Sequence, residues 1–291
     1  MNVWILSNEK AGRGLPADDL VSLVERAGHT VLGVAKQYDK RTRTPIRHLD
    51  LIIAAGGDGT VAAAASLAST SSVPLAILPL GTANNVATSL GLTHSVPELI
   101  ARWASARRVP FDVGRVRSAS KQWCVVEGVG GGLVPAGIAR AQSAHTLRGE
   151  VDPAVEVAAA VRIFRDALDD LEPRSWTLTI DGVQISEMLL MIEVLNIRSV
   201  GPNLVFGPGA DPSDGYFDVV MAQECHREEL RTYLDRRAEG RDTRLALPTR
   251  RARDVVIATC GELHIDAKCV DTCELGQVAI AIEPMAITVL I

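Results

Sequence analysis

Apolar runs and helical segments alternate over the first hundred residues of the chain. Uninterrupted apolar or β-branched runs predict strands at residues 3–6, 51–55 and 75–78. Helices are predicted at residues 16–27, 60–67 and 85–90. Strands that are apolar throughout, with helices between them, are typical of a parallel sheet covered on both faces. We therefore predict a doubly wound α/β domain over residues 1–110.

The pattern changes after residue 110 to strands with few helices between them. Strands are predicted at residues 123–126, 176–180, 188–195, 216–221, 255–258, 263–265 and 278–282. Runs of strands separated by turn signals predict a C-terminal β-sandwich domain over residues 111–285, with helical insertions at 153–171 and 228–237. The apolar segment 286–291 either returns to the first domain or completes the second.

Length and composition agree with two soluble globular domains. A chain of 291 residues can form two ordinary cores, and 47% hydrophobic with 22% charged residues is a globular balance. The net charge of −5 gives no overall attraction to nucleic acid, so no nucleic-acid partner is predicted. The sequence lacks the basic start of a signal peptide and any run of about 18 apolar residues, which predicts a cytoplasmic protein.

The five cysteines are odd in number and include no Cys-x-x-Cys pair. They are Cys124, Cys225, Cys260, Cys269 and Cys273. This spacing indicates neither a disulfide framework nor a zinc site. We expect reduced and mostly buried thiols.

A glycine turn follows the predicted strand at 51–55. Its sequence is Gly56-Gly57-Asp58-Gly59-Thr60, and an alanine-rich helix comes next. A strand that enters a helix in this way exposes backbone N–H groups and the positive end of the helix dipole, both of which suit a phosphate. The three glycines let a ligand approach the backbone closely. The alternative is an ordinary turn in which Asp58 caps the helix.

The same arrangement recurs one strand later, at Gly81-Thr82-Ala83-Asn84-Asn85. Because adjacent parallel strands end at the same edge of a sheet, the two glycine loops can converge on one ligand. Thr82 or Asn84 alone would be explained as a helix cap, but two such loops together favour a ligand site. The chain has no Gly-Lys pair and no complete Gly-x-Gly-x-x-Gly, which argues against an ordinary P-loop or Rossmann site.

The two loops together resemble the diacylglycerol kinase catalytic family, which includes bacterial lipid kinases, sphingosine kinases and ceramide kinase and is related to the NAD kinases. The resemblance extends over nearly the whole chain. It begins at Asn8 and the loop at 11–14, with Glu9 in place of the family's proline. It continues through a glycine run at 128–132, an aspartate-rich turn at 211–218 and the segment 283–287.

This resemblance implies an ATP-dependent lipid kinase with ATP and Mg²⁺ as cofactors. The enzyme would transfer the γ-phosphate to a hydroxyl of a lipid such as diacylglycerol, in a cleft between the nucleotide-binding domain and the β-sandwich. Asp58 and Asp266 would be catalytic. The residues that would bind the nucleotide are Asn8, Gly56, Gly57, Asp58, Gly59, Thr60, Gly81, Thr82, Asn84 and Asn85.

Aspartates gather on the Pro/Gly turn at 211–218. By similarity to bacterial members of the family, Asp211, Asp214 and the carbonyl group of Tyr216 would hold a structural magnesium ion. The alternative is a solvated turn in which the side chains bond their own backbone.

The sequence departs from the family pattern at two positions. The family has Asn-Asp where this chain has Asn84-Asn85, so one carboxylate is missing. The family's Asp-Gly-Glu, whose glutamate is the base on the lipid hydroxyl, aligns with Asp266-Ala267-Lys268. A lysine cannot act as the same base unless burial lowers its pKa strongly.

These departures leave three functional hypotheses. In the first, the chain is a lipid kinase in which Asp271 or Glu274 substitutes for the base. In the second, it is a nucleotide or lipid sensor of the same fold without turnover. In the third, it is an NAD-kinase-like enzyme, because that related family shares Gly-Gly-Asp-Gly-Thr.

Arginines are frequent between residues 226 and 253, next to an apolar stretch at 245–248. They would suit anionic headgroups, which would bring the protein to the inner face of the membrane, where a lipid substrate lies. Acidic residues are interleaved, so a solvated helix with internal ion pairs is the alternative. The sequence names neither the lipid nor the oligomeric state, and it leaves a homodimer open.

Overall fold

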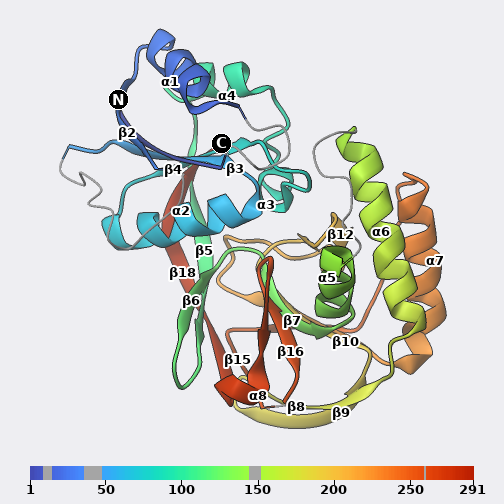
Figure 1. Cartoon of the computed structure of the whole chain (residues 1–291). Helices are drawn as coiled ribbons and strands as arrows, with labels where there is room; N and C mark the ends of the chain where they lie inside the picture. Colours follow the sequence, from blue (N-terminus) through green and yellow to red (C-terminus); the bar gives the residue numbers. More distant parts are fainter. Residues whose placement is uncertain (9–14, 36–47, 144–151, 259) are drawn as a thin grey trace.

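The computed structural model describes residues 1–8, 15–35, 48–143, 152–258 and 260–291, which form an α/β domain and a β-rich domain (Figure 1). The first domain contains a parallel sheet in the order β2-β1-β3-β4, which the last strand of the chain, β18, extends. These strands are β1 (Asn2–Ser7), β2 (Thr30–Ala35), β3 (Leu51–Gly56), β4 (Leu75–Pro79) and β18 (Val278–Leu290). Every residue of β3 is buried, as expected for a strand covered on both faces.

Helices cover both faces of this parallel sheet. They are α1 (Ala17–Arg26), α2 (Asp58–Ser71), α3 (Asn85–Ser89) and α4 (Val96–Arg102). In Figure 1, α1 and α4 lie on one face, whereas α2 and α3 lie on the face turned toward the second domain. The alternation of parallel strands with helices confirms the predicted α/β domain.

The second domain is a sandwich of two mainly antiparallel layers. One layer is the sheet β14-β13-β10-β7-β16-β17. Its strands are β7 (Gly128–Gly132), β10 (Met191–Leu195), β13 (Phe217–Ala222), β14 (Thr249–Ala252), β16 (Glu262–Ile265) and β17 (Lys268–Asp271). The other layer contains the first part of β18 with β5 (Arg108–Arg117), β6 (Gln122–Val125), β8 (Arg174–Ile180), β9 (Val183–Leu189) and β15 (Asp254–Ile257). Trp176 and Phe217 are fully buried in the core between the layers, which confirms the predicted β-sandwich.

Three helices form a second core with side chains of the six-stranded sheet. They are α5 (Leu133–Ser143), α6 (Pro153–Asp169) and α7 (Arg227–Ala238). The helices predicted at 153–171 and 228–237 are confirmed, whereas α5 was not predicted because it follows a glycine-rich strand without a turn. Smaller elements are β11 (Ser199–Val200), β12 (Leu204–Val205), the 3₁₀ turn Glu224–His226 and α8 (Thr272–Leu275).

Strand β18 belongs to both domains. Its first part pairs with β15 and β5, and its register shifts between Glu283 and Ile287. Beyond the shift, Val289 pairs in parallel with Leu75 of β4. The predicted segments 278–282 and 286–291 are therefore one strand. Because β5 and β18 run through both domains, a division at residues 110 and 285 stays a prediction.

The glycine run 128–132 forms strand β7 because large side chains occupy the space beside it. A Cβ atom at Gly130 would lie 2.3 Å from the carboxyl carbon of Glu193, and one at Gly131 would lie 2.1 Å from the Trp176 ring. At positions 130 and 131, only glycine fits beside these neighbours. Residue propensity disfavours glycine in strands, so the sequence pattern did not predict this one.

The strand predicted at 188–195 is two strands, β9 and β10. The chain passes from one layer of the sandwich to the other between them, at Leu190. There the Leu190 N–H donates to the carbonyl of Ala222, and the Leu190 carbonyl accepts from Leu133. The mainly apolar run at 188–195 does not reveal such a crossing, because it continues from the end of β9 through β10 without a turn signal.

The prediction of reduced and mostly buried cysteines is wrong in part. Cys260 and Cys273 form a disulfide, whereas Cys124, Cys225 and Cys269 are free thiols, and Cys225 is exposed. The hairpin of β16 and β17 returns the chain toward its starting point, so the Cα atoms of Cys260 and Cys273 lie 4.7 Å apart despite a separation of 13 residues. Spacing alone does not reveal this pairing.

Candidate active site

The two glycine loops meet at the carboxyl edge of β3 and β4. The Leu80 N–H donates to the Gly56 carbonyl at 3.1 Å, and a Cβ atom at Gly81 would lie only 2.4 Å from the Cα of Gly57. Asn84, at a φ of 51°, closes the second loop through bonds to the carbonyl and N–H of Gly81, at 2.7 and 2.8 Å. The backbones of the two loops are therefore in direct contact, which glycine alone permits at this position.

Asp58 connects the two loops through its side chain. It is the first residue of α2, and its Oδ1 accepts the N–H of Val86, near the start of α3, at 3.0 Å. Burial raises the pKa of Asp58, although N–H groups of Val86 and Asn85 oppose this effect. The carboxylate thus holds the start of α3 against the start of α2.

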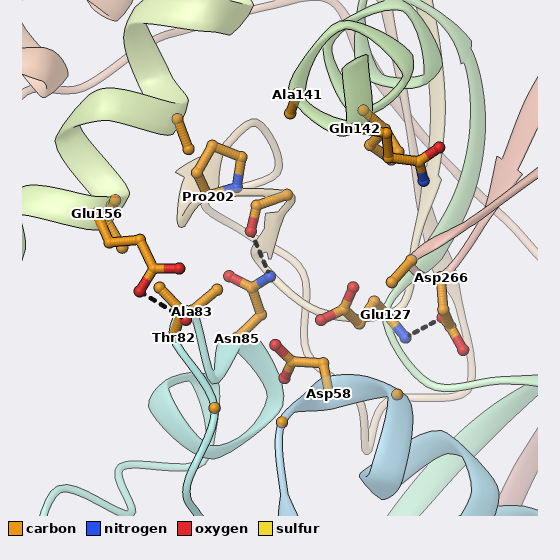
Figure 2. A pocket seen from close by; sticks show the side chains of 18 of the residues that line it. Asp58, Thr82, Ala83, Asn85, Glu127, Ala141, Gln142, Glu156, Pro202 and Asp266 are labelled. Atoms are coloured by element: carbon orange, nitrogen blue, oxygen red, sulfur yellow. Dashed lines mark hydrogen bonds between the residues drawn. The ribbon is translucent and has the colours of Figure 1, made fainter. Parts of the chain in front are cut away.

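A cavity of about 540 Å³ opens beside the loops, between the two domains (Figure 2). Loop residues line one side, and α5, α6 and the β11–β12 turn line the opposite side. The apolar part of that opposite wall consists of Ile138, Ala141, Val157, Ala160, Phe164 and Pro202. Within the described part of the chain, no lysine or arginine lines the cavity.

Most of the predicted nucleotide-binding residues line this cavity. They are Asn8, Gly57, Asp58, Gly59, Gly81, Thr82 and Asn85. The others support the loops, because Gly56 makes room for the Thr60 side chain and Asn84 braces Gly81. The loop at 11–14 lies outside the described residues.

Thr82 connects the second loop to the C-terminal domain. Its hydroxyl donates to Glu156 Oε2 of α6 at 3.1 Å. Asn85 forms a similar connection, since its Nδ2 donates to the carbonyl of Gly201 at 2.9 Å. Its Oδ1 is buried and has no hydrogen-bond partner. The second glycine loop and the apolar wall are therefore held in a fixed relation.

Asp266 lies at the cavity and organises the backbone beside it. Its Oδ1 accepts the N–H groups of Glu127, Val126 and Gly128 at 2.9, 3.2 and 3.3 Å. Burial raises the pKa of Asp266 to about 6, against the opposing effect of these three N–H groups. The predicted catalytic residue is thus placed at the site, where its carboxylate is occupied in fixing residues 126–128.

Glu127 is a site residue that the sequence analysis missed. Its side chain lines the cavity with only 3% of the residue exposed, and its Oε1 has no hydrogen-bond partner. Burial raises its pKa well above the ordinary value, and the negative charges of Asp58 and Asp266 add to this effect. The available signal was a glutamate that directly follows the apolar residues Val125 and Val126.

Lys268 and Asp271 do not lie at the cavity. Lys268 is exposed on β17 and does not line it. Asp271 also lies away from the cavity lining, and its carboxylate caps α8 by accepting the N–H of Cys273 at 2.8 Å. The side chain of Glu274 lies outside the described part of the structure.

The aspartate turn is held by local bonds. Asp211 Oδ1 accepts the N–H and hydroxyl of Ser213 at 3.0 and 2.7 Å. Asp214 accepts the N–H of Tyr216 at 3.0 Å and also pairs with Arg251. These contacts already engage the carboxylates that were predicted to bind magnesium. The magnesium role of Asp211, Asp214 and Tyr216 stays a prediction, and we assign no chemical step to it.

Arginines of α7 pair with acidic neighbours. Arg231 contacts Asp169 of α6 at 2.8 Å and also pairs with Glu228, while Arg227 contacts Glu224 at 2.6 Å. These contacts are the internal ion pairs of the solvated-helix alternative. Among the residues that the structure describes, no helix combines the length and apolar character of a membrane-crossing segment.

The buried carboxyl groups predict that the nucleotide-free protein gains stability as the pH falls from neutrality. Asp266 and Glu127 both have raised pKa values, so the folded state binds protons more tightly than the unfolded chain. The ionised carboxylates therefore destabilise the folded state most at neutral pH. Protonation removes this destabilisation as the pH falls through about 6. We expect urea unfolding to give a free energy roughly 1–3 kcal/mol higher at about pH 5.5 than at about pH 7.5.

Glu127→Gln provides the matched control for this pH dependence. The variant removes one charge without changing the shape of the side chain, so it should be more stable than the wild type at neutral pH and less sensitive to pH. A wild-type protein that loses stability between pH 7.5 and pH 5.5 would contradict the prediction.

Two family models together match most of the chain. A model of the diacylglycerol kinase catalytic domain matches residues 2–116. A model of the YegS C-terminal NAD kinase beta sandwich-like domain matches residues 132–291. The first match contains both glycine loops, and the second contains Asp266 and the apolar wall.

Several named proteins are similar to this chain. The diacylglycerol kinase of Mycobacterium tuberculosis is 27% identical over 246 residues, which cover 78% of this chain and 75% of that protein. The diacylglycerol kinase of Bacillus subtilis is 26% identical over 239 residues, with the same coverage of 78% and 75%. The probable lipid kinase YegS of Escherichia coli is 30% identical over 140 residues, which cover 44% of this chain and 45% of that protein.

A solved structure has the same fold. The crystal structure of a diacylglycerol kinase from Bacillus anthracis superposes with a TM-score of 0.74, at 19% sequence identity, and the match covers 99% of this chain and 96% of that one. The arrangement of both domains is therefore shared with that protein.

Proposed function

The chain belongs to the diacylglycerol kinase catalytic family with a YegS-type C-terminal domain, and we propose on this basis that it transfers the γ-phosphate of ATP to a hydroxyl group of a lipid. The observation that carries the proposal is the cavity between the domains. It has a glycine-loop wall suited to phosphates and an opposite wall of apolar side chains. One cavity thus offers surfaces for both a nucleotide and a lipid.

The loop wall supports binding of the ATP phosphates. Gly57 and Gly59 present backbone at the start of α2, a helix of 14 residues whose dipole is positive at this end. The contact between Gly57 and Gly81 keeps both loops within reach of one polyphosphate. Mg²⁺ would enter together with ATP and neutralise part of the phosphate charge. Transfer would then depend mainly on positioning.

The apolar wall supports a lipid acceptor. Val157, Ala160 and Phe164 of α6 face the cavity with Ile138 of α5. Such a surface suits an acyl or other hydrocarbon chain, whereas an adenosine acceptor would need polar partners for its base and ribose. This wall therefore favours a lipid kinase over an NAD-kinase-like enzyme.

The test is transfer of labelled phosphate from ATP, with Mg²⁺, to diacylglycerol, monoacylglycerol, ceramide, sphingosine, phosphatidylglycerol and NAD. The proposal expects a labelled lipid from the wild type and none from Asp58→Ala, which loses the bond to Val86 and a charge in the cavity. Labelling of NAD alone would overturn the lipid assignment. ATP binding without any transfer would instead favour the sensor hypothesis.

A further inference from the structure

The proposed kinase lacks a glutamate at the family's base position, where Lys268 stands. We propose that Glu127 is the general base, accepting the proton of the lipid hydroxyl during transfer. This inference rests on the proposed function. Glu127 lies at the junction of β6 and β7, about 140 residues before the family position, and so on a different strand.

The other carboxylates at the cavity are already engaged. Among the described residues that line it, the acidic ones are Asp58, Glu127, Glu156 and Asp266. Asp58 accepts the N–H of Val86, Glu156 accepts the hydroxyl of Thr82, and Asp266 accepts three backbone N–H groups. Of these four residues, only Glu127 has a fully buried carboxylate oxygen without a hydrogen-bond partner.

An unpartnered buried carboxylate oxygen is costly, because folding removes it from water without a replacement bond. Oε1 of Glu127 lines a cavity large enough for a ligand, so a substrate hydroxyl can supply the missing donor. Figure 2 shows the Glu127 carboxylate directed toward Asp58 and Asn85, at the centre of the site. Oε1 of Glu127 is therefore available to accept a hydrogen bond from a ligand.

Hydrogen bonds fix the backbone of Glu127. Its N–H donates to Asp266 Oδ1 at 2.9 Å, and its carbonyl accepts the N–H groups of Asn196 and Ile197 at 2.8 and 3.3 Å. Asp266 in turn lies at the cavity edge next to Ala267. A base must be within hydrogen-bond reach of its proton, and these bonds fix the backbone from which the Glu127 side chain enters the cavity.

Glu127 also accounts for the second departure from the family pattern. Asn85 stands where the family has aspartate, and its side chain contacts Glu127 closely enough to favour the ionised carboxylate. An aspartate at position 85 would add a third negative charge beside Asp58 and Glu127. With the neutral Asn85 of α3, Asp58 has one carboxylate neighbour in this part of the cavity, and Glu127 provides it instead of position 85.

The charges around Glu127 make it a stronger base than an exposed glutamate. Burial, followed by the negative charges of Asp58 and Asp266, raises its pKa, and the Asn85 contact only partly opposes this. A carboxylate with a higher pKa takes up a hydroxyl proton more readily, provided that it is ionised when the lipid binds.

The chemical step balances without a further reactant. The hydroxyl oxygen of the lipid forms a bond to the γ-phosphorus of ATP, and the bond between that phosphorus and the β–γ bridging oxygen breaks. The bridging electron pair leaves with ADP, and the hydroxyl proton moves to Glu127, which later releases it to water. The products are the lipid phosphate, ADP and one proton.

The test compares Glu127→Gln with the wild type and with Lys268→Gln. Glutamine keeps the size of the side chain but cannot accept the proton, so kcat should fall at least about 100-fold. The dissociation constant for ATP and the midpoint of thermal unfolding should not worsen, which separates a catalytic loss from misfolding. Lys268→Gln should keep the wild-type rate, because Lys268 is exposed and does not line the cavity.

Each outcome bears on either the inference or the proposed function. Glu127→Gln with a kcat within about threefold of an active wild type overturns the role of Glu127 and leaves the kinase assignment intact. A loss of rate in Lys268→Gln as large as that in Glu127→Gln also overturns it. A wild type that binds ATP but phosphorylates no lipid overturns the proposed function, and the inference with it. Glu127→Asp, which retains a carboxylate, should be more active than Glu127→Gln.

Discussion

Replacing Gly81 with alanine is expected to lower phosphoryl transfer at least about 100-fold, because a shift of about 1 Å between positioning elements has an effect of this order. The added methyl group would lie 2.4 Å from the Cα of Gly57 and 2.9 Å from Oδ1 of Asn84. The nearest atom belongs to the backbone, so no rotation of a side chain relieves the clash. The two loops must move apart, and phosphate positioning is lost. Initial rates of lipid phosphorylation and calorimetric titration with ATP measure the effect.

Gly59→Ala is the matched comparison for Gly81→Ala. It adds the same methyl group to the neighbouring loop, at a position where no atom lies within 4 Å. The spacing of the loops should therefore be preserved, and the variant should bind ATP at least about tenfold more tightly than Gly81→Ala does. Equal affinities for ATP in the two variants would show that the contact between the loops is not what positions the nucleotide.

The two glycine loops were predictable because their signals are local. In each loop, a buried strand, a glycine turn and a helix follow one another within a short stretch, and parallel strands place both turns at one edge. The contact between Gly57 and Gly81 adds a reason for the glycines that the pattern alone did not give. The sequence thus contained the fold class and most of the residues in the glycine-loop wall of the cavity.

The part of the cavity around Glu127 and Asp266 depends on contacts between residues far apart in the sequence, so it was not predictable in the same way. Glu127 reaches the cavity because Asp266, 139 residues later in the chain, binds its N–H. The strand that follows consists mainly of glycines, whose local preference gives no strand signal. Alignment to a family motif directed attention to Lys268, whereas the structure places that residue on the surface. A charged residue that ends an apolar run was the remaining signal.

A series of buried polar contacts supports the position of Glu127. Glu193 Oε2 lies 2.6 Å from His264 Nε2, and both residues are fully buried. His264 Nδ1 lies 2.9 Å from the carbonyl oxygen of Asp266, whose carboxylate binds the N–H of Glu127. A charged His264 donates in both directions. The contacts therefore connect the core of the six-stranded sheet to the proposed base.

Replacing Glu193 with alanine is expected to lower the free energy of unfolding by about 3–5 kcal/mol, as when one partner of a buried ion pair is removed. Burial alone would lower the pKa of His264, but the charge and hydrogen bond of Glu193 outweigh it and raise the pKa. Without Glu193 the imidazolium loses its counterion in a site closed to water. Urea denaturation of the wild type and the variant at neutral pH measures the difference.

The double variant Glu193→Leu with His264→Leu separates the lost charge partner from the lost volume. It replaces both polar groups with apolar side chains, and such exchanges of buried ion pairs are often neutral or stabilising. We expect it to be more stable than Glu193→Ala, yet slower in phosphoryl transfer than the wild type, because the carbonyl of Asp266 no longer has its partner. A double variant with the wild-type rate would show that this series of buried polar contacts contributes to folding alone and does not position Glu127.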